Sequence, residues 1–329
     1  MNNVKISLAI SEYDHVRDLT SGRVRPEGID LTPLIFEVEE IFFRFTKHRE
    51  WDVSEMSFGK YVSLIAAGDE TLTAIPVFPS RIFRQSSIYV RRDSGLKDPK
   101  NLAGCKVGIP EWVQTAGIYT RGWLQHTVGL PLREISWCQA GVNQPGRVEK
   151  VKIDLPEGIK YQSYPDKCLS DMLVDGDVDA VMTAHPPQCF KDGDANIGRL
   201  FEDYRPVEEA YWKETGIFPI MHVIAIRQAV LDQFPWVAMN LFTAFEEAKR
   251  RSIVRAGEIT ASRFPIPWCF HDAKKAEAYF DGDYWPYGID DNRVTLEAFL
   301  GFAHEQGVCR RPVKPEELFA QQVQDSFKV

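Results

Sequence analysis

The sequence predicts an α/β protein of two lobes, each with a mixed, mostly parallel sheet flanked by helices, with a ligand cleft between the lobes. Two observations predict this class. Strand-like apolar runs alternate with amphipathic helical segments over the first third of the chain, and a second alternation begins near Asp93. With 329 residues, the chain is long enough for two such units with a hydrophobic core. We expect lobe 1 to comprise residues 1–90 and 215–329, and lobe 2 to comprise residues 91–214.

The first third contains four apolar runs that predict strands and two segments that predict helices. From Phe58, apolar residues recur at i+3, i+4 and i+7, the pattern of an amphipathic helix, and Gly68 follows where that helix would end. The predicted strands are residues 4–10, 29–36, 52–57 and 72–77, and the predicted helices are residues 38–48 and 58–67. Strands that alternate with helices predict a mostly parallel sheet.

The rest of the chain continues the alternation and then becomes rich in helices. The predicted strands are residues 105–110 and 178–183, and the predicted helices are residues 96–103, 114–128, 168–173, 237–250 and 294–305. In folds of this class the carboxyl ends of the parallel strands open onto a crevice in which ligands bind. We therefore expect functional side chains directly after predicted strands.

Composition and charge exclude several classes of protein. The net charge of −8, without a basic stretch, argues against a nucleic-acid partner, so an anionic substrate needs a local group of arginines. The sequence shows no signal peptide and no apolar run long enough for a bilayer, so we expect a cytoplasmic protein without a membrane partner. The six scattered cysteines favour free thiols over disulfides. The sequence leaves open whether the protein forms a homo-oligomer.

Short strings spread over nearly the whole chain resemble a known family. They are SFGKY at residues 57–61, IPVFPSR at 75–81, SSIYV at 86–90, VGIPE at 107–111, PGR at 145–147, TGIFPIMH at 215–222, WPYG at 285–288 and EQG at 305–307. These strings resemble the 4,5-dihydroxyphthalate decarboxylase family. The resemblance implies a type II periplasmic-binding-protein-like fold. It also implies loss of one carboxyl group from 4,5-dihydroxyphthalate in phthalate degradation, giving protocatechuate and carbon dioxide. Residues 138–144 and 183–187 differ from the family pattern, so the diacid used stays open.

That reaction sets the chemistry that a site must supply. Each carboxylate of the diacid lies para to a phenolic hydroxyl, so the ring itself can hold the electrons when a proton reaches the carbon that bears the carboxylate. We therefore expect no cofactor, and no residue spacing in the sequence requires a metal. The protein must anchor the retained carboxylate, deliver the proton, polarise the phenol and exclude water from the departing carboxylate.

Arginine is the expected anchor, because its planar guanidinium meets a carboxylate with two parallel hydrogen bonds. Arg81 and Arg84 follow a predicted strand, and Ser80 lies beside them. Arg147, in a predicted loop, is a further candidate. The alternative interpretation is that Arg81 and Arg84 are exposed charges on a linker.

Three histidines and one glutamate are candidates for the proton transfers. His185 directly follows a predicted strand, His222 lies inside an apolar string, and His15 lies in the first strand-to-helix turn. Glu111, between a predicted strand and a helix, is placed to accept a catechol hydroxyl. Histidine among apolar residues is more often a hydrogen-bonded core residue, and Glu111 has capping of the helix as its alternative role.

Three further polar residues are expected to contact the substrate. Thr115 lies at a predicted helix start, where backbone N–H groups favour an anion, and Ser57 and Tyr13 follow strands of the first lobe. The leading hypothesis has Arg81 or Arg84 as anchor, His222 or His185 as acid and Glu111 at a hydroxyl. The alternatives are a non-catalytic solute-binding protein for an aromatic carboxylate, or an enzyme of the same architecture that acts on another acid.

Overall fold

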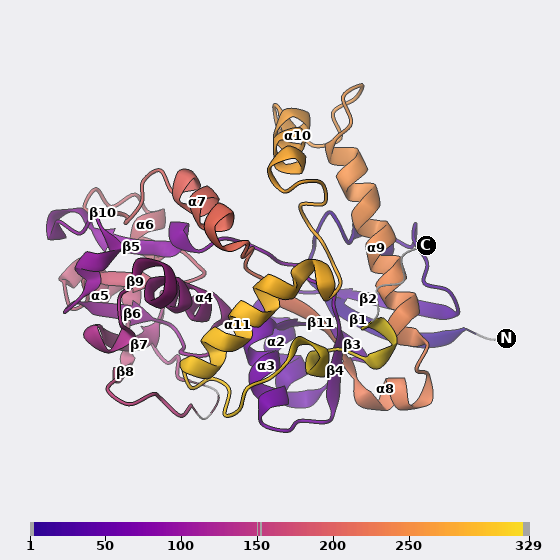
Figure 1. Ribbon diagram of the computed structural model, residues 1–329, viewed down its shortest axis with the longest axis horizontal. Helices are drawn as coiled ribbons and strands as arrows, with labels where there is room; N and C mark the ends of the chain where they lie inside the picture. The colour runs from indigo at the N-terminus through magenta and orange to yellow at the C-terminus, as the bar shows by residue number, and fades with distance from the viewer. Residues whose placement is uncertain (1–2, 150, 152, 325–329) are drawn as a thin grey trace.

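Two mixed sheets organise the protein (Figure 1). The computed structural model describes residues 3–149, 151 and 153–324. The first sheet has the order β2-β1-β3-β11-β4, with β1 Val4–Ile10, β2 Ile29–Ile35, β3 Val53–Ser57, β4 Leu72–Ile75 and β11 His222–Arg227. The second has the order β10-β5-β9-β6-β7-β8, with β5 Ile88–Arg91, β6 Lys106–Ile109, β7 Ser136–Gly141, β8 Lys160–Cys168, β9 Ala180–Met182 and β10 Ile197–Arg199.

One late strand completes the first sheet. Strands β1, β2 and β3 are parallel, whereas β11 enters antiparallel between β3 and β4. Its register places His222 opposite Ser57, at the carboxyl end of β3. The chain therefore runs from the first sheet into the second and back again. The predicted boundaries at residues 90 and 214 stay predictions, and β5 begins at Ile88, just before the first of them.

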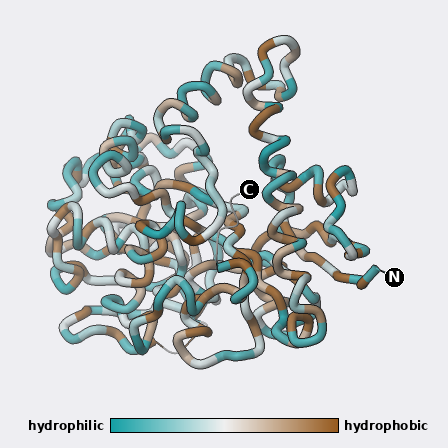
Figure 2. Tube along the Cα trace, turned by 45° about the vertical axis from the view of Figure 1, so that its right-hand side comes forward, coloured by the Kyte–Doolittle hydropathy of each residue, from teal (hydrophilic) through white to brown (hydrophobic). Residues whose placement is uncertain are grey.

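Helices cover both sheets. They are α1 Arg17–Thr20, α2 Val38–His48, α3 Phe58–Ala66, α4 Thr115–Trp123, α5 Leu169–Asp175, α6 Gln188–Lys191, α7 Arg205–Thr215, α8 Gln228–Gln233, α9 Val237–Ala256, α10 Cys269–Tyr279 and α11 Arg293–Glu305. Hydrophobic stretches run through the middle of the molecule, while α10 and the end of α9 project beyond the sheets with polar and apolar residues interspersed (Figure 2).

Two predicted helices differ from the observed structure. The helix predicted over residues 114–128 is α4 followed by a π-helical turn, Leu124–Val128. The helix predicted over residues 96–103 is wrong in extent, because only the 3-10 turn Pro99–Leu102 forms, with the Asp98 side chain accepting from the Lys100 N–H.

Five of the described strands, β5, β7, β8, β10 and β11, were not predicted. The side chains of β7 are mostly buried beside β6, whereas β8 is an edge strand with mostly exposed polar residues. A polar edge strand lacks the hydrophobic alternation that distinguishes a strand from a loop, because its outer side faces water.

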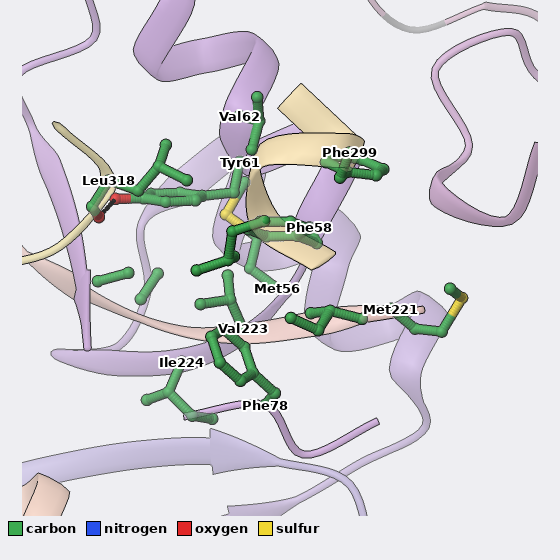
Figure 3. Close-up of a cluster of buried hydrophobic side chains, with 14 of the residues drawn as sticks. Met56, Phe58, Tyr61, Val62, Phe78, Met221, Val223, Ile224, Phe299 and Leu318 are labelled. Atoms are coloured by element: carbon green, nitrogen blue, oxygen red, sulfur yellow. Dashed lines mark hydrogen bonds between the residues drawn. The ribbon is translucent and has the colours of Figure 1, made fainter. Parts of the chain in front are cut away.

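Helix α11 packs across the junction of the two lobes (Figure 1). Its Phe299 ring lies 4.7 Å from the ring of Phe58 on α3 and 4.8 Å from that of Tyr119 on α4. All three side chains are almost completely buried. Figure 3 shows Phe58 and Phe299 in one cluster with Phe78. This aromatic contact sets how the two lobes lie relative to each other.

Phe299→Ala should lower the free energy of unfolding by about 3–5 kcal/mol, because it leaves a cavity between both lobes. Urea denaturation monitored by tryptophan fluorescence measures this loss. Val294→Ala on the same helix is the matched control, because Val294 is 56% exposed and its truncation should cost less than about 0.5 kcal/mol. Equal urea midpoints for the two variants would contradict the packing role.

Candidate active site

A cavity of about 410 Å³ lies between the lobes. Its walls come from α2, α3 and the start of β11 on one side, and from the start of α4 and the loops after β7 and β9 on the other. The apolar lining residues are Val38, Phe42, Phe43, Val113, Ala116, Ala184 and Met221. The ionisable ones are Glu39, Lys47, Lys60, Arg84, Glu111, Arg147, Glu149, His185 and His222. Apolar walls with several cations suit an aromatic anion.

His222 is held from behind by a buried carboxylate. Its Nδ1 lies 2.6 Å from Oε1 of Glu55, whose side chain is fully buried, whereas the His222 side chain is 17% exposed. The Tyr13 hydroxyl donates to the same oxygen at 2.6 Å, and the Ser11 N–H donates to Oε2 at 2.9 Å. The Phe42 ring meets the imidazole edge-on, with centroids 4.9 Å apart. The imidazole is therefore fixed in the cavity wall.

Arg84 carries a buried charge beside the cavity. Within the described part of the chain, its guanidinium donates hydrogen bonds to the Met221 sulfur, from Nε at 3.1 Å and from Nη2 at 2.7 Å. A thioether is a weak acceptor. Burial lowers the pKa of Arg84 to about 10, so the side chain still carries its charge at neutral pH. This arrangement favours an anion in the cavity.

Two contacts at the cavity join the lobes. The hydroxyls of Ser57, at the end of β3, and Thr115, at the start of α4, lie 3.0 Å apart. The Gly59 N–H also donates to the Thr115 hydroxyl. At Gly59 a side chain would collide with the Val113 carbonyl, because an added Cβ would lie 2.8 Å from that oxygen. The close approach of α3 and α4 therefore requires glycine there.

Two ion pairs form between charged residues of the cavity lining. Arg147 Nε lies 2.7 Å from Glu111 Oε1 within the second lobe. His185 Nε2 lies 2.7 Å from Glu39 Oε1, which joins the end of β9 to α2 of the first lobe. The hydrogen bond from His185 lowers the pKa of Glu39 to about 2. Both members of this second pair are more than half exposed, so it lies at the mouth of the cavity.

Comparisons with known proteins decide the family. No family model matches the chain. The chain is 34% identical to a 4,5-dihydroxyphthalate decarboxylase of Comamonas testosteroni over 330 positions, which cover all of both chains. The protein belongs to the 4,5-dihydroxyphthalate decarboxylase family. A relative of the same name from Pseudomonas putida is 36% identical over 204 residues, 62% of this chain and 79% of the relative.

A solved structure confirms the predicted fold. The periplasmic aliphatic sulphonate binding protein of Escherichia coli superposes with a TM-score of 0.56, over 98% of this chain and 99% of that chain. The identity between the two is 11%, so the likeness concerns the fold alone. The family member thus has the two-lobed periplasmic-binding-protein fold.

The structure brings seven of the eleven predicted site residues to one cavity. These are Ser57, Arg84, Glu111, Thr115, Arg147, His185 and His222. Tyr13 lies behind His222, with its hydroxyl 3.3 Å from Nδ1. Burial raises the pKa of Tyr13 well above its usual value, so its hydroxyl remains a hydrogen-bond donor.

Besides Tyr13, three predicted residues lie outside the cavity lining, and Arg81 is the clearest case. Its guanidinium donates to the carbonyls of Phe218 and Pro286 and to the Asn292 side chain. These contacts hold the guanidinium among three chain segments. A substrate contact of Arg81 stays a prediction, and the structure gives this side chain a structural role.

The other two residues outside the lining have similar structural surroundings. The Ser80 carbonyl accepts the Met221 N–H, and the His15 ring packs between those of Tyr13 and Trp285. Ser80 and His15 were expected at the site because they follow predicted strands. Side chains at a strand end can face either the cavity or the core behind its wall, and the sequence does not distinguish the two.

The sequence analysis missed several residues of this site. Glu55 is the most informative of them, because a carboxylate inside the buried strand β3 was a visible signal. Fully buried carboxylates occur where they are paired and hydrogen-bonded. Phe42, Lys60 and Glu149 carried no comparable signal, since each lies on a helix or loop where its residue type is common.

Among the residues that the structure describes, no group of three or more His, Cys, Asp or Glu side chains is placed to hold a metal ion. No helix of that part of the chain is long and apolar enough to cross a bilayer.

His15 should make stability depend on pH. Burial lowers its pKa to about 4, and its Nε2 is buried without a hydrogen-bond partner among the described residues. An unfolded histidine titrates near pH 6.5, so between about pH 6.5 and 4 the unfolded chain binds the proton that the folded one rejects. The free energy of unfolding should therefore fall as the pH is lowered, with His15 contributing on the order of 2 kcal/mol between pH 7 and 5.

Urea denaturation of wild type and His15→Asn at pH 7 and 5 tests this. The variant should lose less stability on acidification. His271→Asn, at an exposed histidine, serves as the control and should behave like wild type. Equal acid sensitivity of His15→Asn and wild type would contradict the assignment.

Proposed function

We propose that this protein decarboxylates 4,5-dihydroxyphthalate without an oxidant, giving protocatechuate and carbon dioxide. Membership of the family supports the reaction class. The observation that carries the proposal is the presence of a buried arginine, Arg84, and a carboxylate-held histidine, His222, in the wall of one largely apolar cavity. An anchor for an anion and a proton donor thus face the same ligand-sized space.

Arg84 anchors the carboxylate that the product retains. Its guanidinium is buried and contacts a thioether, and a carboxylate is a much stronger acceptor than the Met221 sulfur. Arg147 and its partner Glu111 lie in the opposite wall. In this scheme Glu111 accepts a hydrogen bond from a catechol hydroxyl, which draws electron density into the ring.

His222 delivers the proton. The Nε2–H of the protonated imidazole transfers its proton to the ring carbon that bears the departing carboxylate. The bond between that carbon and the carboxylate then breaks, its electron pair returns to the ring, carbon dioxide leaves and aromaticity is restored. The phenolic oxygen para to that carbon stabilises the dienone-like intermediate. The imidazole regains a proton from solvent, so each turnover consumes one proton.

His185 has a different part in this scheme. It is 52% exposed and paired with Glu39 at the mouth, where bulk water competes for any proton transfer. His222 is 17% exposed and lies beside Phe42 and Met221 in the cavity wall, so it is better shielded from bulk water than His185. The scheme therefore assigns the acid to His222 and contact between the lobes to His185.

The direct test uses purified, EDTA-treated protein with 4,5-dihydroxyphthalate. Carbon dioxide release and the phenolic product are followed together by headspace analysis and chromatography. The expected result is equimolar carbon dioxide and protocatechuate without added metal. Conversion only after addition of a divalent metal would reject the metal-free scheme, and no conversion under either condition would reject the proposed function.

Substitution of Arg84 should weaken substrate binding, whereas substitution of Arg81 should lower stability. Arg84→Gln should raise KM roughly 10- to 100-fold, because it removes a charge-assisted contact worth about 1.5–3 kcal/mol, and should leave the urea midpoint close to wild type. Arg81→Gln should lower the urea midpoint and leave the KM of the folded protein close to wild type, because Arg81 contacts protein carbonyls. Steady-state kinetics and urea denaturation of both variants decide the matter. A raised KM for Arg81→Gln together with a lowered urea midpoint for Arg84→Gln would contradict this assignment, because Arg81 would then bind the substrate and Arg84 would stabilise the fold.

A further inference from the structure

We propose that Glu55 is a positioning residue that holds His222 with its Nδ1 proton towards the protein and its Nε2 towards the substrate. This inference rests on the proposed function, in which His222 is the proton donor. Glu55 is not among the residues that line the cavity, so it acts on the reaction through His222.

The burial of Glu55 needs an explanation that the fold does not supply. It lies within β3, between the apolar strand β11 and β1, and its side chain is fully buried. Among the described residues, no lysine or arginine lies within ion-pairing distance of it, and the His222 imidazole is the basic group that contacts it. An apolar residue would suit this strand position at lower cost, because a buried carboxylate loses its hydration. The carboxylate is therefore explained by its effect on His222.

The hydrogen bonds around Glu55 determine which imidazole nitrogen carries the proton. Oε2 accepts the Ser11 N–H, and Oε1 accepts the Tyr13 hydroxyl. Both partners are donors, so the carboxylate oxygens of Glu55 act as acceptors in these bonds. The 2.6 Å contact between Oε1 and Nδ1 is then a hydrogen bond in which Nδ1–H donates.

With Nδ1 engaged, Nε2 is the ring nitrogen that remains for the cavity. When the ring is neutral, Nε2 has a lone pair there, and when the ring is protonated, Nε2 carries the proton that the reaction needs. The negative charge of Glu55 also stabilises the protonated ring, as the buried aspartate does for the histidine of a serine protease.

The surroundings oppose rotation of the imidazole. The Phe42 ring meets it edge-on at an interplanar angle of 86°, and the backbone of His222 is fixed by its register opposite Ser57. A ring flip would give up the bond to Glu55 and place a carbon atom against a buried carboxylate. The inference thus depends on geometry from three elements: α2, β3 and β11.

Nitrogen-15 NMR of the wild-type protein, with labelled histidine and without substrate, tests the tautomer directly. The His222→Gln spectrum assigns the resonances. When the ring is neutral, Nδ1 should be the protonated nitrogen and Nε2 the unprotonated one. Protonated Nε2 in neutral His222 would overturn the inference, whatever the activity of the protein.

Kinetics of variants test the consequence for the reaction. Glu55→Gln keeps the shape and removes the charge, and should lower kcat roughly 10- to 100-fold with KM nearly unchanged, because such outer contacts typically matter by that factor. Glu55→Asp keeps the charge and should restore part of kcat. Tyr13→Phe, which removes a donor to Glu55 and the 3.3 Å contact with His222 Nδ1 but leaves the carboxylate in place, should have a smaller effect. Wild-type kcat in Glu55→Gln would overturn the inference.

The two proposals fail in distinguishable ways. If the protein does not decarboxylate the diacid but its NMR spectrum shows the Nδ1–H tautomer, the proposed function falls and the positioning of His222 by Glu55 stands. If the reaction proceeds and the tautomer is Nε2–H, the function stands and this inference falls. Since the wild-type spectrum needs no substitution at Glu55, the test survives a variant that fails to fold.

Discussion

The antiparallel pairing of β11 with β3 is the constraint on which the rest of the structure depends. Residues 222–227 are separated from β3 by the whole second sheet, and they insert between β3 and β4. To reach that position the chain must cross between the lobes twice, and the cavity lies between the lobes that these crossings connect. The same pairing places His222 at the carboxyl end of β3, within reach of Glu55. The pairing of β11 with β3 thus determines both the connection of the two lobes and the position of His222.

The charge of the protein is consistent with an anionic ligand because it is unevenly distributed. The chain as a whole carries −8, yet Lys47, Lys60, Arg84 and Arg147 all line one cavity. Of the lining carboxylates, Glu111 is paired with Arg147 and Glu39 with the imidazole of His185. Arg84 differs, since a sulfur atom is its hydrogen-bond partner within the described residues. A buried cation with a weak acceptor attracts a carboxylate strongly over a short range, which the long-range field of an acidic protein does not prevent.

Sequence reasoning succeeded where the signal is local. Helix α2 and strand β1 have the predicted bounds, because amphipathic period and apolar runs are local properties. The rule that ligands bind beyond strand ends found Ser57 and His185, and the family resemblance supported His222. The same rule also selected Arg81 and His15, because a strand end does not determine whether its side chains face the cavity or the core behind it. Arg81 and Arg84 are three residues apart, and only tertiary contacts separate their roles.

The residue that the sequence could have revealed, and that was overlooked, is Glu55. Sequence reasoning looks for functional side chains in polar turns, whereas Glu55 belongs to the hydrophobic strand that supports the turn. A cleft between two lobes and an arginine suffice to bind an anion, as solute-binding proteins of this fold require. Catalysis adds a demand that binding does not have, because a proton must arrive from one direction on one ring carbon. A histidine in the wall meets that demand only if its other nitrogen is occupied, and the group that occupies it must lie deeper than the wall. In the proposed scheme Glu55 therefore places a charge in the core, where a stable fold alone would place an apolar side chain.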